Sequence, residues 1–345
     1  MQDRGNLRQA TGASADSFPD ELMQSIRAFQ DSRVILTGIE LDVFTAIGAG
    51  ATALDVARSR STDVRGTEML LNALVALGLL EKTGAAFRNS QAAAQFLAGD
   101  SPRCARTALL HTVHLWDRWS TLTECVRTGT AVLQDEIKDR GEAWTEAFIA
   151  AMDRNARERA PAVVRAVGAE GVRTMLDVGG GSAAYSISFA EAAPGLEAVV
   201  LDLPGVVPIA QGHVERAGLD GRVRIRAGDL RTDPLGRQDY ELVLVSAICH
   251  MLGPAENRDL IARSFSALKP GGRIAIQDFI LEPDKTSPRQ AAMFSLNMLV
   301  GTEAGASYSV DEYTGWLEGA GFHKVARISL PGPADLMVGE KPASP

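Results

Sequence analysis

The chain has 345 residues, of which 46% are apolar and 23% are charged, an ordinary globular composition with room for two or three domains. The formal net charge of −8 disfavours nucleic acid and anionic membrane surfaces as partners, because both are negatively charged. Three cysteines (Cys104, Cys125 and Cys249) are far apart and lack metal-ligand spacing, so we expect no metal site and no disulfide framework.

Residues 1–18 are polar and predict a flexible arm. They lack the apolar core of a signal peptide, and the longest apolar stretch, residues 73–80, is far too short to cross a membrane. Together with the cysteine usage, these features predict a cytoplasmic protein.

Residues 19–110 predict a mainly helical domain of the winged-helix type. Apolar residues recur at helical spacing from Met23 to Phe44, with Gly38 expected to break the helix. The elements expected next are two helices and a hairpin, over residues 53–58, 64–77 and 79–89. The second of these helices has no basic face for phosphates, so packing or dimerisation is favoured over DNA binding.

Residues 111–170 predict a helical linker, with helices over residues 105–126 and 144–167. Beyond it, residues 171–345 alternate short apolar strands with helices, which predicts a doubly wound α/β domain whose sheet is mostly parallel. The seven expected strands are residues 174–178, 198–203, 223–227, 242–246, 273–279, 324–329 and 336–340.

Three successive strands of this domain end in residues suited to a nucleoside. The first runs into Gly179-Gly180-Gly181, where glycines let the backbone turn sharply and approach a ligand. The second ends at Asp202, whose carboxylate can accept hydrogen bonds from ribose hydroxyls, and the third ends at Asp229 and Leu230. Since parallel strands end at one edge of a sheet, the sequence predicts a single nucleoside site there.

Two alternatives stay open at this point. Each strand-end residue taken alone also fits a plain turn or a helix cap. The loop also places Ala184 in the register of the third glycine of GxGxxG, so it does not exclude NAD and a dehydrogenase.

The motifs as a set are more specific. They are Leu176-Asp177-Val178-Gly179-Gly180-Gly181, Asp202-Leu203-Pro204, Gly228-Asp229-Leu230, Ile248-Cys249-His250, Leu268-Lys269-Pro270-Gly271-Gly272 and the run from Trp119 to Gly129. Over about residues 20–342 the chain resembles the caffeate, acetylserotonin and antibiotic-biosynthesis O-methyltransferases, a class I family dependent on S-adenosylmethionine (SAM). The resemblance implies a Rossmann-like catalytic domain, an N-terminal winged-helix dimerisation domain, SAM as cofactor with S-adenosylhomocysteine (SAH) as product, and no metal.

The resemblance also implies roles for single residues. Cofactor contacts fall on Asp177, Gly179 and Gly181 at the methionine end, Asp202 and Leu203 at the ribose, and Asp229 and Leu230 at the adenine. Ser246 stands where plant members carry a lysine, and we include it among the cofactor-binding residues.

His250 is the candidate general base. Methylation of a neutral hydroxyl needs a base, and imidazole titrates near neutrality. The matching histidine is the base in the family, and Asp278 stands where members with this mechanism carry a glutamate that orients it. The family's second flanking glutamate is replaced by Ser307, with Glu303 only nearby.

The acceptor pocket is expected to be apolar and to suit a small aromatic molecule. Its predicted residues are Trp116, Phe148, Met152, Asn155, Met293, Asn297 and Met298, although ordinary core packing explains any one of them equally well. Methylation of carbon or nitrogen, or a nucleoside-sensing regulator without catalysis, are the competing functions.

The N-terminal half is expected to form a homodimer. Its helices carry more apolar surface than a domain of some 90 residues covers easily by itself. The alternative is that these helices pack on residues 105–168 of the same chain.

Overall fold

The computed structural model describes residues 19–133 and 141–343. The chain divides into two compact units, residues 1–113 and 114–345. The predicted arm over residues 1–18 lies outside the described residues, and the predicted linker boundaries at 111 and 170 remain predictions. None of the described helices is both long and apolar enough to traverse a bilayer.

The first unit has the predicted winged-helix outline. Its elements are α1 (Asp20–Glu40), α2 (Val43–Ile47), β1 (Ala51–Thr52), α3 (Ala53–Arg60), α4 (Val64–Ala76), β2 (Leu80–Thr83), β3 (Ala86–Asn89) and α5 (Gln91–Phe96). The three strands form an antiparallel sheet in the order β1-β3-β2. Helix α6 (Arg106–Ser120) follows and crosses the division between the units.

Gly38 does not break the first helix, contrary to the prediction. Helix α1 continues to Glu40, and the chain turns at Asp42, whose φ is 52°. A Cβ atom on Gly38 would lie 3.2 Å from the side chains of Leu74 and Phe44. The glycine therefore permits close packing on α4 and α2 rather than ending the helix.

The prediction of one continuous helix over residues 105–126 is also wrong, because the structure has two helices there. Helix α6 ends at Ser120 and α7 (Leu122–Thr128) begins after Thr121, whose hydroxyl donates to the carbonyl of Arg118 at 2.7 Å. A threonine that bonds to the preceding turn competes with the helical pattern and favours a break. Helix α8 (Glu142–Val167) agrees with the prediction to within two residues at its start.

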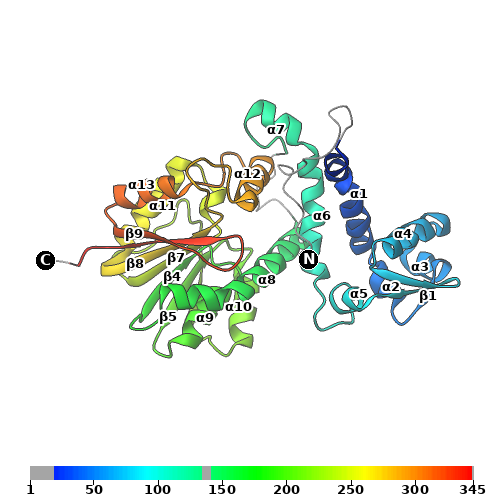
Figure 1. Cartoon of the computed structure of the whole chain (residues 1–345). Coiled ribbons are helices and arrows are strands. Elements are labelled where there is room, and N and C mark those ends of the chain that lie inside the picture. The colour runs from blue at the N-terminus through cyan, green and yellow to red at the C-terminus, as the bar shows by residue number, and fades with distance from the viewer. Residues whose placement is uncertain (1–18, 134–140, 344–345) are drawn as a thin grey trace. The chain divides into compact units, whose positions relative to one another are not determined.

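The second unit contains the predicted seven-stranded sheet, in the order β6-β5-β4-β7-β8-β10-β9 (Figure 1). The strands are β4 (Thr174–Val178), β5 (Glu197–Asp202), β6 (Val223–Ala227), β7 (Tyr240–Ser246), β8 (Leu268–Asp278), β9 (His323–Ile328) and β10 (Asp335–Glu340). Only β10 runs against its neighbours, so the sheet is mostly parallel. Strand β8 begins five residues before the predicted start.

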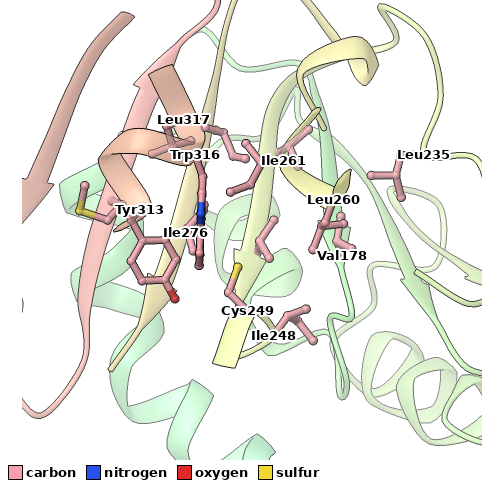
Figure 2. Close-up of a cluster of buried hydrophobic side chains, with 14 of the residues drawn as sticks. Val178, Leu235, Ile248, Cys249, Leu260, Ile261, Ile276, Tyr313, Trp316 and Leu317 are labelled. Carbon is pink, nitrogen blue, oxygen red and sulfur yellow. The ribbon is translucent and has the colours of Figure 1, made fainter. Parts of the chain in front are cut away.

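Helices cover both faces of this sheet. They include α9 (Ala184–Ala192), α10 (Val207–Arg216), α11 (Pro254–Ala267) and α13 (Val310–Gly319). Helix α12 (Arg289–Gly301) instead packs on α7 and on η3 (Cys249–Met251), a single turn of 3-10 helix after β7. Alternate strand residues divide between two cores, as period-two side chains require. Leu176, Val243 and Ile276 pack with residues of α11 and α13, whereas Met175 and Leu244 pack with α8, α9 and α10. Figure 2 shows Ile276 together with Ile261 of α11 and Trp316 of α13.

Candidate active site

The glycine-rich turn joins β4 to α9 in a conformation that requires glycine. Gly179 and Gly181 have φ angles of 67° and 56°, in the left-handed region. The Gly179 amide donates to the carbonyl of Leu201 at 2.7 Å, which ties the turn to β5. A Cβ atom on Gly179 would collide with the side chain of Ile248, so the turn lies directly against the segment that carries His250.

Asp177 lies beneath this turn and is completely buried. Its Oδ2 atom accepts a hydrogen bond from the Ser186 hydroxyl at 2.8 Å, while Oδ1 is buried without a partner. Burial raises the pKa of Asp177 to about 7, and the charge of Asp202 acts in the same direction. A carboxyl group with this pKa is partly protonated at neutral pH.

Asp202 joins the ends of β4 and β5. Its Oδ2 atom accepts from the Gly181 amide at 2.7 Å, and Oδ1 accepts from the Leu203 amide at the same distance. Burial raises the pKa of Asp202, although both amide donors favour the charged form. The structure therefore brings the first two predicted cofactor segments into direct contact.

The third predicted segment, Asp229 and Leu230, is held by α11. Asp229 accepts from the amide of Arg231 at 2.9 Å, which closes a tight turn. The Arg263 guanidinium donates to the Leu230 carbonyl at 2.7 Å, a contact that was not predicted because the two residues are 33 positions apart. A cavity of about 290 Å³ opens beside Leu230 and is also lined by Leu252 and Arg263.

Ser246, at the end of β7, belongs to a buried polar cluster. Its hydroxyl donates to Gln277 Oε1 at 2.6 Å, and the Tyr185 hydroxyl donates to the same oxygen at 2.8 Å. Gln277 Nε2 is buried without a partner. Neither Gln277 nor Tyr185 was predicted, because they are 92 residues apart in the chain.

His250 and Asp278 form a buried pair, as the sequence predicted that they would meet. His250 Nδ1 lies 2.6 Å from Asp278 Oδ1, and the His250 amide donates to Asp278 Oδ2 at 3.1 Å. The side chains are 8% and 1% exposed. A carboxylate on Nδ1 fixes the tautomer with the proton on Nδ1, which leaves Nε2 with a free lone pair.

Two phenylalanines enclose the imidazole. The ring of Phe294, from α12, meets the His250 ring edge to face at a centroid distance of 4.8 Å. Phe279 stacks on Phe294 at 4.0 Å. Phe294 lies one residue from the predicted Met293, which instead is 43% exposed. Phe294 was not among the predicted residues, and Met293 remains a prediction for the acceptor pocket.

The predicted acceptor residues lie on three helices. In α8, Phe148 stacks with Trp144 at 5.0 Å, Met152 is half-buried and Asn155 is exposed. In α12, Asn297 accepts a hydrogen bond from Trp119 Nε1 of α6 at 2.9 Å, and Met298 is buried. Trp116 of α6 is half-buried. The bond to Asn297 joins two of the segments predicted to form the pocket, through Trp119, which was not among the predicted residues.

The fold and this edge of the sheet define the class. A seven-stranded Rossmann-like sheet, with a glycine-rich turn after its first strand and acidic residues at the next two strand ends, is that of a SAM-dependent methyltransferase. Residues 125–323 match the O-methyltransferase domain family, and residues 23–99 match the O-methyltransferase dimerisation domain. The chain belongs to this family of O-methyltransferases.

Named relatives and solved structures similar to this chain are also O-methyltransferases or methyltransferases. The tetracenomycin polyketide synthesis 8-O-methyl transferase TcmO of Streptomyces glaucescens is 32% identical over 94% of this chain and 97% of its own. The 3-hydroxy-5-methyl-1-naphthoate 3-O-methyltransferase of Streptomyces sahachiroi is 34% identical over 90% and 92%. Human N-acetylserotonin methyltransferase, in complex with SAM, superimposes with a TM-score of 0.82 at 25% identity, over 96% of this chain and 100% of the other.

The chain is therefore a SAM-dependent O-methyltransferase of the secondary-metabolite type. PigF, a similar structure with a TM-score of 0.86 at 25% identity over 94% of this chain and 100% of its own, contains SAH. The residues present fit such a cofactor, because the glycine turn presents no side chain at Gly179 or Gly181, Asp177 Oδ1 is buried without a partner, and Asp202 and Asp229 lie at or just beyond the ends of two adjacent parallel strands. Among residues 19–133 and 141–343, no group of three or more His, Cys, Asp or Glu side chains is placed to hold a metal ion.

Proposed function

We propose that this enzyme methylates a hydroxyl group of a small aromatic molecule and that His250 is the general base. The observation that carries the proposal is the buried contact of 2.6 Å between His250 Nδ1 and Asp278. It leaves Nε2 as the nitrogen that can take a proton, at the carboxyl end of β7. A buried histidine with an orienting carboxylate and one free nitrogen is what general-base catalysis requires.

When bound, SAM supplies an electrophilic methyl group. The chain's own contribution is to orient the acceptor hydroxyl and to accept its proton at His250 Nε2. Asp278 then stabilises the imidazolium that forms, because its carboxylate faces the charged ring at Nδ1. Phe294 and Phe279 restrict water around the ring, which strengthens this interaction.

We further propose that the three strand-end segments hold the cofactor as the family resemblance implies. Gly179, Gly181 and buried Asp177 would form the methionine end, and Asp202 with Leu203 the ribose subsite. The adenine would lie against Asp229 and Leu230, beside the cavity that Leu230 lines. Ser246 would contribute through its bond to Gln277.

An aromatic acceptor is supported by the apolar side chains near the base. Phe294 and Phe279, beside the imidazole, offer flat rings, which favour planar ligands. The relatives named for polyketide and naphthoate substrates support the same chemical class.

The test is a comparison of His250→Ala with His323→Ala, whose imidazole is exposed. General-base contributions are about 10² to 10⁴-fold, so the first variant should lose kcat by that order with unchanged SAH affinity, and the second should keep its activity. A panel of phenols adds a sharper criterion. Phenols that are already ionised at the assay pH should be methylated by His250→Ala at close to the wild-type rate. Full activity of His250→Ala on neutral phenols would disprove the proposal that His250 is the general base.

We also propose that the dimerisation domain makes the enzyme a homodimer through α1. Ile26 and Phe29 on this helix are 54% and 55% exposed, which is unusual for large apolar side chains of a monomer. Phe29→Asp should convert the dimer to a monomer in light scattering. Val126→Asp, at a residue 62% exposed in the second unit, is the matched control and should leave the dimer intact. A monomeric wild-type protein at micromolar concentration would refute the proposal.

A further inference from the structure

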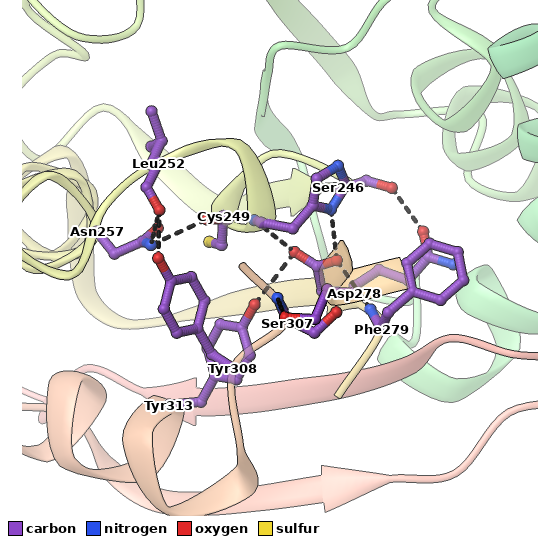
Figure 3. Close-up of polar contacts among 12 residues, drawn as sticks. Ser246, Cys249, Leu252, Asn257, Asp278, Phe279, Ser307, Tyr308 and Tyr313 are labelled. Carbon is purple, nitrogen blue, oxygen red and sulfur yellow. Dashed lines mark hydrogen bonds and ion pairs between the residues drawn. The ribbon is translucent and has the colours of Figure 1, made fainter. Parts of the chain in front are cut away.

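Asp278 is saturated by four hydrogen-bond donors, one of which comes from a helix outside the predicted site. Tyr313, in the first turns of α13, donates its hydroxyl to Asp278 Oδ2 at 3.1 Å (Figure 3). The same oxygen accepts from the His250 amide, and Oδ1 faces His250 Nδ1 and the Phe279 amide, the latter at 2.8 Å. The carboxylate thus has no freedom to rotate away from the imidazole.

The Tyr313 hydroxyl can act only as a donor in this contact. Its side chain is completely buried, and burial together with the charge of Asp278 raises the pKa of Tyr313 well above its ordinary value. The ring is fixed by edge contacts with Tyr308 at 6.2 Å and Trp316 at 5.4 Å between centroids. A neutral, immobile hydroxyl is therefore aimed at the carboxylate that orients the base.

Ser307 replaces the family's second flanking glutamate, and Glu303 lies near it in the sequence, but neither of them holds Asp278 or His250 in place. Ser307 Oγ is buried without a partner, and Glu303 is exposed. Neither forms a hydrogen bond with Asp278 or with His250. We infer that Tyr313 is a positioning residue for methyl transfer, which holds Asp278 so that this carboxylate orients His250. This inference rests on the proposed role of His250 as base.

The direction of the effect follows from the contact. Without the tyrosine donor, the negative charge of Asp278 is less dispersed and interacts more strongly with a protonated His250. The protonated form of His250 is then stabilised relative to the neutral form. The other titratable or charged groups around the pair are Cys249 beside Tyr313 and Asp278, Tyr308 across the aromatic cluster, and Arg159 of α8, 5.9 Å from the Phe279 ring. Removal of the Tyr313 hydroxyl also removes its interaction with the Cys249 thiol, but burial raises the pKa of that thiol well above its ordinary value, so the thiol stays neutral in the variant.

The experiment compares Tyr313→Phe with Tyr308→Phe. Tyr308 is the matched control, because its buried hydroxyl donates to the backbone carbonyl of Leu252 and not to the pair. In Tyr313→Phe, the acidic limb of the kcat profile should move to higher pH by about half a unit to one unit, and the plateau should fall by about 3- to 10-fold. Tyr308→Phe should leave the limb in place, and KM for SAM should be unchanged in both variants.

A second measurement separates positioning from general damage to the fold. In an Asp278→Asn background, Tyr313→Phe should cause no further fall in kcat, because its route to the base is already broken. An acidic limb that stays at the wild-type pH in Tyr313→Phe, or additive losses in the double variant, would overturn the inference. Activity of His250→Ala on neutral phenols would instead overturn the proposed base, so the two failures are distinguishable.

Discussion

Asp177 gives the protein a pH-dependent weakness that Asp177→Asn should remove. The pKa of this buried carboxyl is about 7, against 3.8 for an unperturbed aspartate. Because the folded-state pKa is raised, the stabilising contribution of the protonated form is complete below pH 3.8 and is lost as the pH rises through 7. A shift of about three units corresponds to about 4 kcal/mol at 1.36 kcal/mol per unit.

About 2 to 3 kcal/mol of this loss falls between pH 5 and pH 8, where the protein is convenient to handle. Asparagine cannot ionise and its carbonyl can still accept from Ser186, although its amide adds a buried donor without a partner. That penalty does not depend on pH. The difference in unfolding free energy between Asp177→Asn and wild type should therefore move in favour of the variant by about 2 to 3 kcal/mol over this range.

The assay is thermal unfolding of cofactor-free protein at intervals from pH 5 to pH 8. For a unit of this size, 1 kcal/mol corresponds to about 2 to 4 °C, so the Tm difference should change by about 5 to 10 °C. Asp284→Asn is the control, since hydrogen bonds from Thr286 lower the pKa of Asp284 and its titration lies below the tested range. A Tm difference that stays constant from pH 5 to pH 8 would refute the raised pKa.

Two further predictions concern the proposed cofactor site. Gly179→Ala should weaken SAH binding at least 10-fold, because its Cβ atom would displace Ile248, whereas Gly181→Ala has open space around its Cβ and should cost about 1 to 2 kcal/mol of stability from backbone strain alone. Equal SAH affinity of the two variants by calorimetry would contradict this reasoning. Asp202→Asn should raise the Kd for SAH by about 10- to 100-fold, as expected when a charged acceptor is lost, while Asp239→Asn, at an exposed turn, should bind normally.

Local patterns were sufficient to predict most of the architecture. The strands of the second unit are apolar runs bounded by polar turns, and a residue such as Met175 or Leu176 faces a core on either side of the sheet. The glycine turn and strand-end carboxylates were visible for the same reason, since each signal lies within a few neighbouring positions. The predicted helix break at Gly38 was wrong, because a glycine that permits close packing and a glycine that ends a helix look alike in sequence.

The supporting contacts of the site had no such local signal. Tyr313 is 35 residues from Asp278, and its spacing with Trp316 and Leu317 marks only a buried helix face. Gln277 reads as a strand residue, and the partners that make it part of a polar cluster come from α9 and β7. Pairings of this kind depend on the three-dimensional course of the chain, so they became visible only in the structure.

The side chains of the last two residues of β8 point to opposite sides of the sheet and contact different parts of the site. Gln277 bonds to Tyr185 on the side of α9, whereas its neighbour Asp278 bonds to Tyr313 on the side of α13. Strand β8 is held in register by parallel pairing with β7 and antiparallel pairing with β10. A single residue inserted earlier in this strand would place the amide of Gln277 opposite His250, and a single deletion would place Phe279 there. Selection on this enzyme should therefore tolerate changes in the length of its loops far more readily than any change in the length of β8.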